Sequence, residues 1–204
     1  MEVKTGYLFA KPYWTTAIDL NINDLQEECY EFRSKNKGII KSNRGKNSYH
    51  SPDINNLDKK STIRLLMLKI LTCATAIHKK SRKGTLEITN AWININNKGG
   101  FNLPHTHAGA VYSGVYYIKI PIDKINAGNF CFYREFSETH LSSEACMGNF
   151  KDGYNQLPSD CSSTQIVPQE KMLIIFPSWV THGVEANKTN EDRISISFNI
   201  RIRN

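Results

Sequence analysis

Three of the six histidines have a spacing along the chain that would allow them to bind one metal ion. His105 and His107 follow a Gly-Gly turn and Pro104, and side chains at i and i+2 on an extended segment face the same side. His182 lies 75 residues after His107, just beyond an apolar run at 172–176. A distant third ligand, brought close by the fold, would complete a three-ligand site with open positions. The spacing alone leaves a local packing role for each histidine equally open.

A second feature is an arginine on an alternating segment. Arg193 and Ser195 share one face of the run 193–203, and Ile194 and Ile196 share the other. An arginine beside a hydroxyl on a strand suits a carboxylate, which it can bind through two parallel hydrogen bonds. Taken alone, an arginine that follows the polar turn 190–192 is better interpreted as a surface residue.

The elements that must position these residues are strands. From residue 85 onward the hydrophobic period is two, and turn residues bound each short run. The predicted strands are 86–96, 111–121, 129–133, 171–177, 182–186 and 193–203. Because no helical segment separates them, we expect an antiparallel sandwich or barrel.

The first part of the chain predicts helices. The segment 23–33 has Asn23 as its N-cap candidate and acids in its opening turn. The longer run 57–79 repeats apolar residues at helical spacing, with Lys and Arg on the other face. Between them, 35–56 is predicted to be mostly irregular. We expect one domain over 1–204, of class α+β, with a helical and basic part at 1–84 and a β core at 85–204.

Length and composition exclude several classes of protein. The chain has 204 residues, 40% hydrophobic and 22% charged, which is typical of a folded globular protein. No apolar run approaches the 18 residues of a membrane-spanning helix, and the first residues lack the pattern of a secretory signal. Five widely spaced cysteines without a CxxC pair favour free thiols. We therefore expect a cytoplasmic protein, or one in the host cytoplasm if a phage encodes it.

The net charge of +7 is unevenly distributed. Residues 33–83 contain 14 Lys and Arg against only Asp53 and Asp58, a local excess of +12. Such a block could bind nucleic acid or an acidic partner. It contains few aromatic residues for stacking on bases and no nucleic-acid motif, so a solvated lysine-rich face is the favoured interpretation.

Three segments together resemble a known family. They are NLPHTHAGAVYSGVYYIKIP at 102–121, FPSWVTH at 176–182 and RISISFN at 193–199. In this order they resemble the iron(II)/2-oxoglutarate-dependent oxygenases, in particular a small prolyl-hydroxylase-like group found in marine bacteria and phages. The resemblance covers 85–203 well and the N-terminal part loosely. It implies a double-stranded β-helix (jelly roll) core with N-terminal supporting helices, which agrees with the predicted strands.

The resemblance also implies roles for individual residues. His105 matches the first iron ligand and His182 the distal histidine ligand, and His107 occupies the position between them. Arg193 matches the residue that pairs with the far carboxylate of 2-oxoglutarate. The implied catalytic residues are therefore His105, His107, His182 and Arg193, of which the three histidines bind the metal. The residues implied for cosubstrate binding are Arg193, Ser195, Tyr117, Asn94 and Asn96.

One position departs from the wider superfamily. There, the residue two after the first histidine is Asp or Glu, whereas here it is His107. Three neutral imidazoles would leave the site one negative charge poorer and would change the redox potential of the metal. Three interpretations follow: three-histidine coordination, which we prefer, a carboxylate supplied from elsewhere in the chain, or a metal-binding fold without activity.

The resemblance implies a dioxygenase that uses iron(II), 2-oxoglutarate and dioxygen to hydroxylate a primary substrate that the sequence does not identify, such as a protein or peptide side chain. The alternatives are a catalytically silent jelly-roll protein that binds a metal or ligand, and a nucleic-acid demethylase of the same superfamily. The long polar segment 134–169 is predicted to cover the mouth of the site as a substrate-reading lid. No membrane partner is expected.

Overall fold

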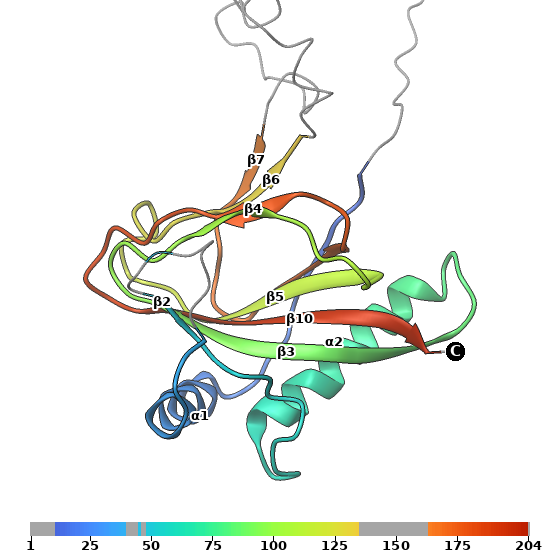
Figure 1. The fold of residues 1–204 in the computed structure, drawn as a ribbon, viewed down its shortest axis with the longest axis horizontal. Coiled ribbons are helices and arrows are strands. Elements are labelled where there is room, and N and C mark those ends of the chain that lie inside the picture. Colours follow the sequence, from blue (N-terminus) through green and yellow to red (C-terminus); the bar gives the residue numbers. More distant parts are fainter. Residues whose placement is uncertain (1–10, 40–44, 46–47, 135–162, 204) are drawn as a thin grey trace, which may run out of the picture.

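The computed structural model describes residues 11–39, 45, 48–134 and 163–203, which form two antiparallel sheets and two helices. The sheets lie one above the other, and the helices cover the outer face of the larger one (Figure 1). The larger sheet has the strand order β1 (Trp14–Ala17), β8 (Met172–Pro177), β5 (Tyr112–Lys119), β10 (Arg193–Arg203), β3 (Thr85–Asn96) and β2 (Ser48–His50). The smaller sheet has the order β4 (Asn102–His105), β9 (His182–Val184), β6 (Phe130–Tyr133) and β7 (Ser163–Ile166).

Strand alternation divides β10 between two environments. Ile194, Ile196 and Phe198 are fully buried in the core that the large sheet shares with the helices. Arg193 and Ser195 take the opposite face, which looks toward the small sheet. The predicted bounds of this strand, 193–203, are confirmed without change. One sequence pattern therefore supplies both the packing of the helices and a polar wall between the sheets.

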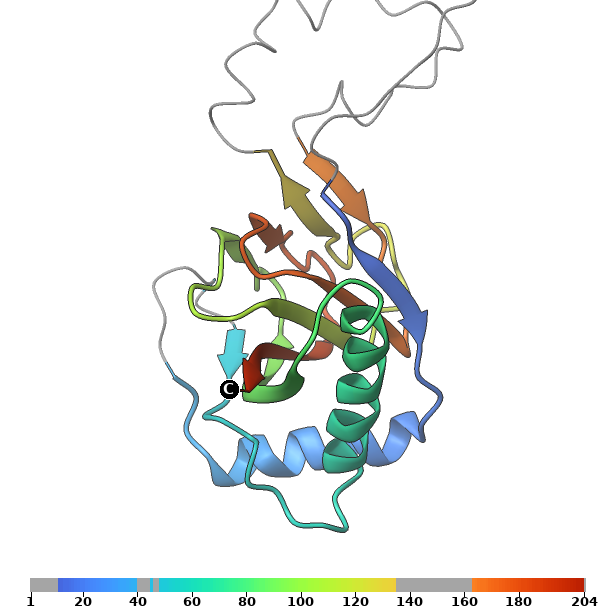
Figure 2. The ribbon, with the colours of Figure 1, turned by 90° about the vertical axis from the view of Figure 1, so that its right-hand side faces the viewer.

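The helices α1 (Ile22–Lys35) and α2 (Thr62–His78) cross each other beneath the large sheet (Figure 2). The helix α2 packs on β3 and α1 packs on α2 and β5, and Leu25, Leu66 and Ile70 are fully enclosed. The burial of each such side chain contributes about 1.5–3 kcal/mol to the stability of the fold. No helix in the described part of the chain is long and apolar enough to cross a membrane.

The helix ends differ from the prediction. The N-cap of α1 is Asn21, whose side chain accepts a hydrogen bond from the amide of Asn23, so the expectation that Asn23 is the cap is wrong. The helix α2 begins at Thr62 rather than near residue 57, because Ser61 caps it. Glu28 from α1 completes this cap: its carboxylate accepts hydrogen bonds from Ser61 Oγ and Thr62 N, both at 2.6 Å. This polar contact joins the two helices, and the hydropathy pattern of the sequence does not predict it.

Replacing Glu28 by glutamine is expected to lower the free energy of unfolding by about 1–2 kcal/mol at pH 7, since charge-assisted hydrogen bonds at a helix N-terminus are lost. Burial raises the pKa of Glu28, but the hydrogen bonds from Ser61, Thr62 and Ile63 outweigh it and hold the pKa below its ordinary value of 4.5. A depressed pKa stabilises the fold above that value, so the difference should shrink as the pH falls below about 4.5. Urea unfolding of both proteins at pH 7 and pH 3.5 measures this, and an equal difference at both pH values would contradict it.

Short strands account for the remaining differences from the sequence. The segment 35–56, expected to be mostly irregular, contains the edge strand β2, and β1 and β4 are likewise too short to show a clear period. The segment 134–169, expected to be a lid, contains β7, which pairs with β6. That part of the expectation is wrong, because Ser163–Ile166 is a strand of the small sheet. Residues 135–162 of the same segment lie outside the described residues.

Candidate active site

A pocket of about 490 Å³, including its open mouth, lies between the two sheets. Its polar wall comes from the inner face of β3, β5 and β10, and its apolar wall includes Phe130, Phe176 and Val184. All the site residues expected from the sequence line this pocket: Asn94, Asn96, His105, His107, Tyr117, His182, Arg193 and Ser195. The fold thus brings together residues that are up to 101 positions apart in the chain.

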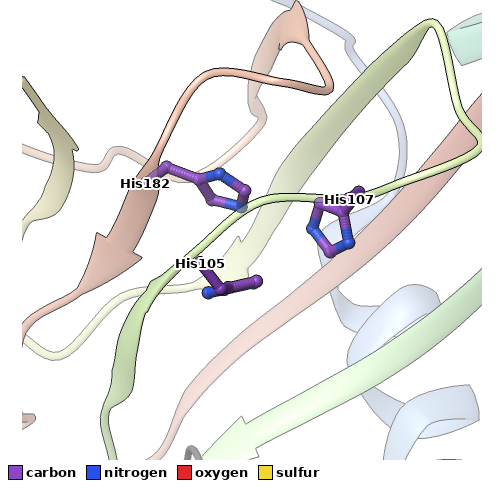
Figure 3. A group of neighbouring side chains, drawn as sticks. All are labelled: His105, His107 and His182. Carbon is purple, nitrogen blue, oxygen red and sulfur yellow. The ribbon is translucent and has the colours of Figure 1, made fainter. Parts of the chain in front are cut away.

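The three histidines form one cluster. Their ligand nitrogens all lie within 4.8 Å of one another. The ring centroids are 4.5 Å apart for His105 and His182, 4.9 Å for His105 and His107, and 5.1 Å for His107 and His182. Figure 3 shows the side chains grouped where β9 passes the segment that carries the first two histidines. Imidazole nitrogens are donors that suit iron, zinc, copper and nickel, so the donor set fits a transition metal.

His107 reaches the cluster from a loop. The strand β4 ends at His105, so His107 lies two residues beyond the strand, yet the two side chains meet as the i, i+2 spacing predicted. The loop is held because the amide of His107 donates to the carbonyl of Ser178, 3.0 Å away. Ser178 lies in the turn between β8 and β9 that leads to His182. The same turn therefore positions two of the three histidines.

Hydrogen bonds orient two of the imidazoles. Nδ1 of His105 lies 2.7 Å from the carbonyl of Leu103, and Nδ1 of His182 lies 3.0 Å from the carbonyl of Val180. A carbonyl can only accept, so each Nδ1 carries the proton, and in the neutral ring the lone pair is on Nε2. This arrangement leaves the same nitrogen of both rings able to bind a metal.

The environment of His182 keeps it uncharged. Burial lowers its pKa to about 3, with His105 and His107 lowering it further and the hydrogen bond to Val180 raising it. The ring of Phe130 stacks on the imidazole with ring centroids 5.7 Å apart, and the ring of Phe176 is tilted against it with centroids 4.5 Å apart. A neutral imidazole is the form that binds metals, so His182 needs no deprotonation at neutral pH.

No carboxylate of the described residues belongs to the cluster. Among the described residues, the group of His, Cys, Asp and Glu side chains close enough to share an ion contains only His105, His107 and His182. Within the described part of the chain, no Asp or Glu therefore supplies the ligand that His107 replaces.

Arg193 is buried, with only 2% of its surface exposed. The interpretation of this residue as a surface arginine at the end of a turn is therefore wrong. Its Nη1 donates to the carbonyls of Ala127, Gly128 and Glu185, whereas its Nη2 is buried without a hydrogen-bond partner among the described residues. Burial lowers the pKa of Arg193, and Tyr117 and Glu185 raise it. The guanidinium stays charged, because arginine does not lose its proton in proteins, and so the pocket wall holds a buried cation.

Tyr117 lies next to this cation. It stands opposite Ser195 in the register of β5 and β10, and its hydroxyl is buried without a hydrogen-bond partner among the described residues. Burial raises the pKa of Tyr117 to about 12, with Arg193 lowering it and Cys131 raising it. The phenol is therefore protonated at neutral pH and can donate a hydrogen bond to an anion. Unpaired buried donors are costly, so these two groups fit a ligand with acceptor oxygens.

The two asparagines differ in how their amides are used. Asn94 donates from Nδ2 to Ser197 Oγ at 3.0 Å, and its Oδ1 lies 3.4 Å from Nδ1 of His50. Asn96 stands directly opposite Arg193 in the register of β3 and β10. Its Oδ1 is buried without a hydrogen-bond partner among the described residues. Of the two, Asn96 is the closer neighbour of the arginine along the sheet.

Two further residues near the pocket are not among those expected from the sequence. Trp92 lines it, with its ring 5.9 Å from that of His107 and 5.3 Å from that of His50. The alternation that places Asn94 and Asn96 on one face also places Trp92 there, so the sequence could have predicted Trp92 as a pocket residue. His50 comes from the short edge strand β2, which shows no clear period, and only the sheet register brings it beside Asn94.

The fold and the pocket define a class of protein: a mostly β protein with two antiparallel sheets, whose pocket is lined by both a histidine cluster and a buried arginine. The family follows from the sequence comparison. Residues 90–199, more than half of the chain, match the family described as "Putative 2OG-Fe(II) oxygenase", and the chain belongs to it. The protein is therefore an iron(II)- and 2-oxoglutarate-dependent oxygenase, which uses these cofactors with dioxygen, as the resemblance implied.

Solved structures share this fold at low sequence identity. A prolyl-4-hydroxylase from Pseudomonas putida is 14% identical with a TM-score of 0.64, covering 95% of this chain and 94% of its own. A prolyl hydroxylase from Trichoplax adhaerens, in complex with a peptide fragment of hypoxia inducible factor, is 13% identical with a TM-score of 0.60, covering 93% and 83%. HygX from Streptomyces hygroscopicus, with nickel and 2-oxoglutarate bound, is 11% identical with a TM-score of 0.58, covering 94% and 83%. No curated protein matches the sequence.

Proposed function

We propose that this oxygenase binds iron(II) through His105, His107 and His182 and hydroxylates a carbon of a primary substrate. The observation that carries the proposal is one pocket lined by both a histidine cluster and two buried donors, Arg193 Nη2 and Tyr117 Oη, that have no hydrogen-bond partner among the described residues. The cluster suits the metal, and the donors suit the distal carboxylate of 2-oxoglutarate. Iron(II), when bound there, supplies a redox centre that activates dioxygen while 2-oxoglutarate is converted to succinate and carbon dioxide.

The chain's own residues have three tasks in this proposal. Arg193 and Tyr117 hold the distal carboxylate, with Ser195 beside them and Asn96 as the nearer amide, while Asn94 stays bonded to Ser197. Phe130 and Phe176 exclude water on one side of the histidines, which strengthens the electrostatic interactions inside the pocket. His107 brings no negative charge, so the bound metal is more electrophilic than one with a carboxylate ligand.

We further propose that the two sheets form the double-stranded β-helix and that the chain folds as one domain. In support, β1 and β2, which flank α1, belong to the same sheet as the strands of the core. The helices also share a single apolar core with that sheet. The primary substrate is proposed to be a protein or peptide side chain, in line with the peptide bound to the Trichoplax structure.

Anaerobic titration with iron(II) and 2-oxoglutarate, followed by exposure to dioxygen without primary substrate, tests the function. We expect one iron per chain and slow formation of succinate. His107→Asp is the matched variant: it replaces an imidazole by the carboxylate usual in this superfamily, and iron binding should persist. Iron binding without any succinate in either protein would favour the catalytically silent binding protein. Loss of iron in His107→Asp would contradict the position we assign to His107.

A further inference from the structure

We propose that a cradle of three backbone carbonyls, from Ala127, Gly128 and Glu185, aims Arg193 at the cosubstrate, and that Gly128 is the positioning residue on which this cradle depends. The inference rests on the proposed function, since it takes the distal carboxylate of 2-oxoglutarate as the ligand of Arg193. It adds a residue that touches neither metal nor cosubstrate and carries no recognisable functional side chain.

The cradle holds one corner of the guanidinium. Nη1 of Arg193 lies 2.5 Å from the carbonyl oxygen of Ala127, 2.9 Å from that of Gly128 and 3.2 Å from that of Glu185. The guanidinium is planar with its donors in a rigid fork, so fixing Nη1 also restricts where Nη2 can lie. Nη2 is the nitrogen that has no hydrogen-bond partner among the described residues. The cradle thus uses one donor group and reserves the other for a ligand.

The cradle is made of backbone carbonyl dipoles, and the nearby carboxylate of Glu185, which raises the pKa of Arg193, accepts hydrogen bonds from Asn129 and Gln165 instead. Within the described part of the chain, Arg193 forms no ion pair with a carboxylate. A buried carboxylate on Nη1 would neutralise the cation and compete with the incoming dianion. Carbonyl oxygens satisfy the buried donors without forming an ion pair, so the positive charge remains available to the cosubstrate. This explains why backbone rather than side chains surrounds Nη1.

Hydrogen bonds on both sides fasten the two segments of the cradle together. On one side the amide of Glu185 donates to the carbonyl of Asn129 at 2.9 Å, and the amide of Asn129 donates to Glu185 Oε2 at 3.1 Å. On the other side the amide of Lys188 donates to the carbonyl of Asn126 at 2.8 Å. The carbonyls that face Arg193 are therefore not free to move aside.

Gly128 is required at its position for two reasons. Its φ is +83°, a conformation that side chains disfavour. A Cβ added there would lie 2.4 Å from the carbonyl oxygen of Glu185 and 2.5 Å from Nη1 of Arg193. Because the carbonyl belongs to a fastened segment, the guanidinium is the group that must give way. Any residue other than glycine is thus expected to move the guanidinium away from the position in which Nη2 can bind the distal carboxylate.

Gly128→Ala, compared with the parent enzyme, tests the cradle. Anaerobic titrations of the iron(II)-loaded proteins would measure affinity for 2-oxoglutarate and for pyruvate, a 2-oxo acid without the distal carboxylate. We expect 2-oxoglutarate to bind on the order of tenfold to a hundredfold more weakly, since small misplacements of a positioning group have effects of this size. Pyruvate and iron should bind as in the parent, so the preference for 2-oxoglutarate over pyruvate should fall.

Gly84→Ala is the matched control. Gly84 also has a positive φ, +109°, and its added Cβ would lie 2.8 Å from the side chain of Ile202, at the other end of β10, about 30 Å from Arg193. This variant should lower the thermal midpoint yet keep the preference for 2-oxoglutarate. If Gly128→Ala does not fold, Gly128→Asn adds the same Cβ with less backbone strain, because asparagine tolerates positive φ.

The outcomes separate the cradle from the function it serves. An unchanged preference in the Gly128 variant, with the preference lost in Arg193→Ala, would overturn the cradle and leave the proposed function standing. An unchanged preference in both variants would overturn both. Loss of iron or of pyruvate binding in Gly128→Ala would overturn the positioning role, since the substitution would then act on the whole pocket.

Discussion

His182→Ala protein is expected to lose stoichiometric iron(II), with affinity falling on the order of a hundredfold or more, beyond what loss of a supporting residue usually costs. His182 is the most enclosed of the three histidines and the only one that β9 contributes. Without it, His105 and His107 remain on one short segment and offer two ligands instead of three. Anaerobic loading with iron(II), gel filtration and metal analysis would measure the remaining ion.

Two companion variants make this result decisive. His105→Ala should lose iron in the same way, because it removes a ligand from β4, the strand that pairs with β9. His78→Ala is the control: His78 is equally buried, but it contacts Tyr112 and the carbonyl of Lys83 at the end of α2. It should be less stable and still bind one iron per chain. Full iron content in both His182→Ala and His105→Ala would rule out the site.

Arg193→Ala is expected to weaken the binding of 2-oxoglutarate by at least about tenfold while iron binding stays largely intact. A charge-assisted hydrogen bond contributes about 1.5–3 kcal/mol, which corresponds to roughly 10- to 100-fold in affinity. The effect should be large here because Arg193 is only 2% exposed, and its Nη2 has no partner in the described structure to compensate. Isothermal titration of iron-loaded protein under anaerobic conditions would give both affinities.

Arg193→Lys distinguishes charge from geometry. An ammonium keeps the positive charge but cannot form two parallel hydrogen bonds to one carboxylate, so affinity should recover only partly. A lysine would also lack the planar group that the carbonyls of Ala127 and Gly128 hold. If Arg193→Ala binds 2-oxoglutarate as tightly as the parent, the cosubstrate site lies elsewhere and the binding-protein alternative gains support.

Strand alternation determined much of the site from the sequence alone. The run 193–203 forms a strand with those bounds, and its period of two assigns Arg193 and Ser195 to one face whatever surrounds them. The same rule places Asn94 and Asn96 together on β3. Such faces follow from backbone geometry, which needs no knowledge of the partner strands. The resemblance of three short segments added the family, which the sequence comparison then established.

Element ends and loops were decided by tertiary contacts. The long run 57–79 shows the apolar face of α2, but its start at Thr62 depends on Ser61 and on Glu28, which comes from another helix. His107 joins the cluster because a distant turn at Ser178 holds its loop. Periodicity describes the inside of an element, whereas its ends satisfy backbone groups with whatever lies nearby in space.

The surroundings of Arg193 mark the limit of sequence reasoning most clearly. Residue types reveal an arginine that could bind a carboxylate, but they leave open whether it is buried or exposed. The groups that settle this are carbonyls of Ala127, Gly128 and Glu185, and every residue in the chain has such a carbonyl. Backbone atoms carry no residue-specific signal, so only the folded structure, by bringing two distant segments around one guanidinium, decides where that charge can act.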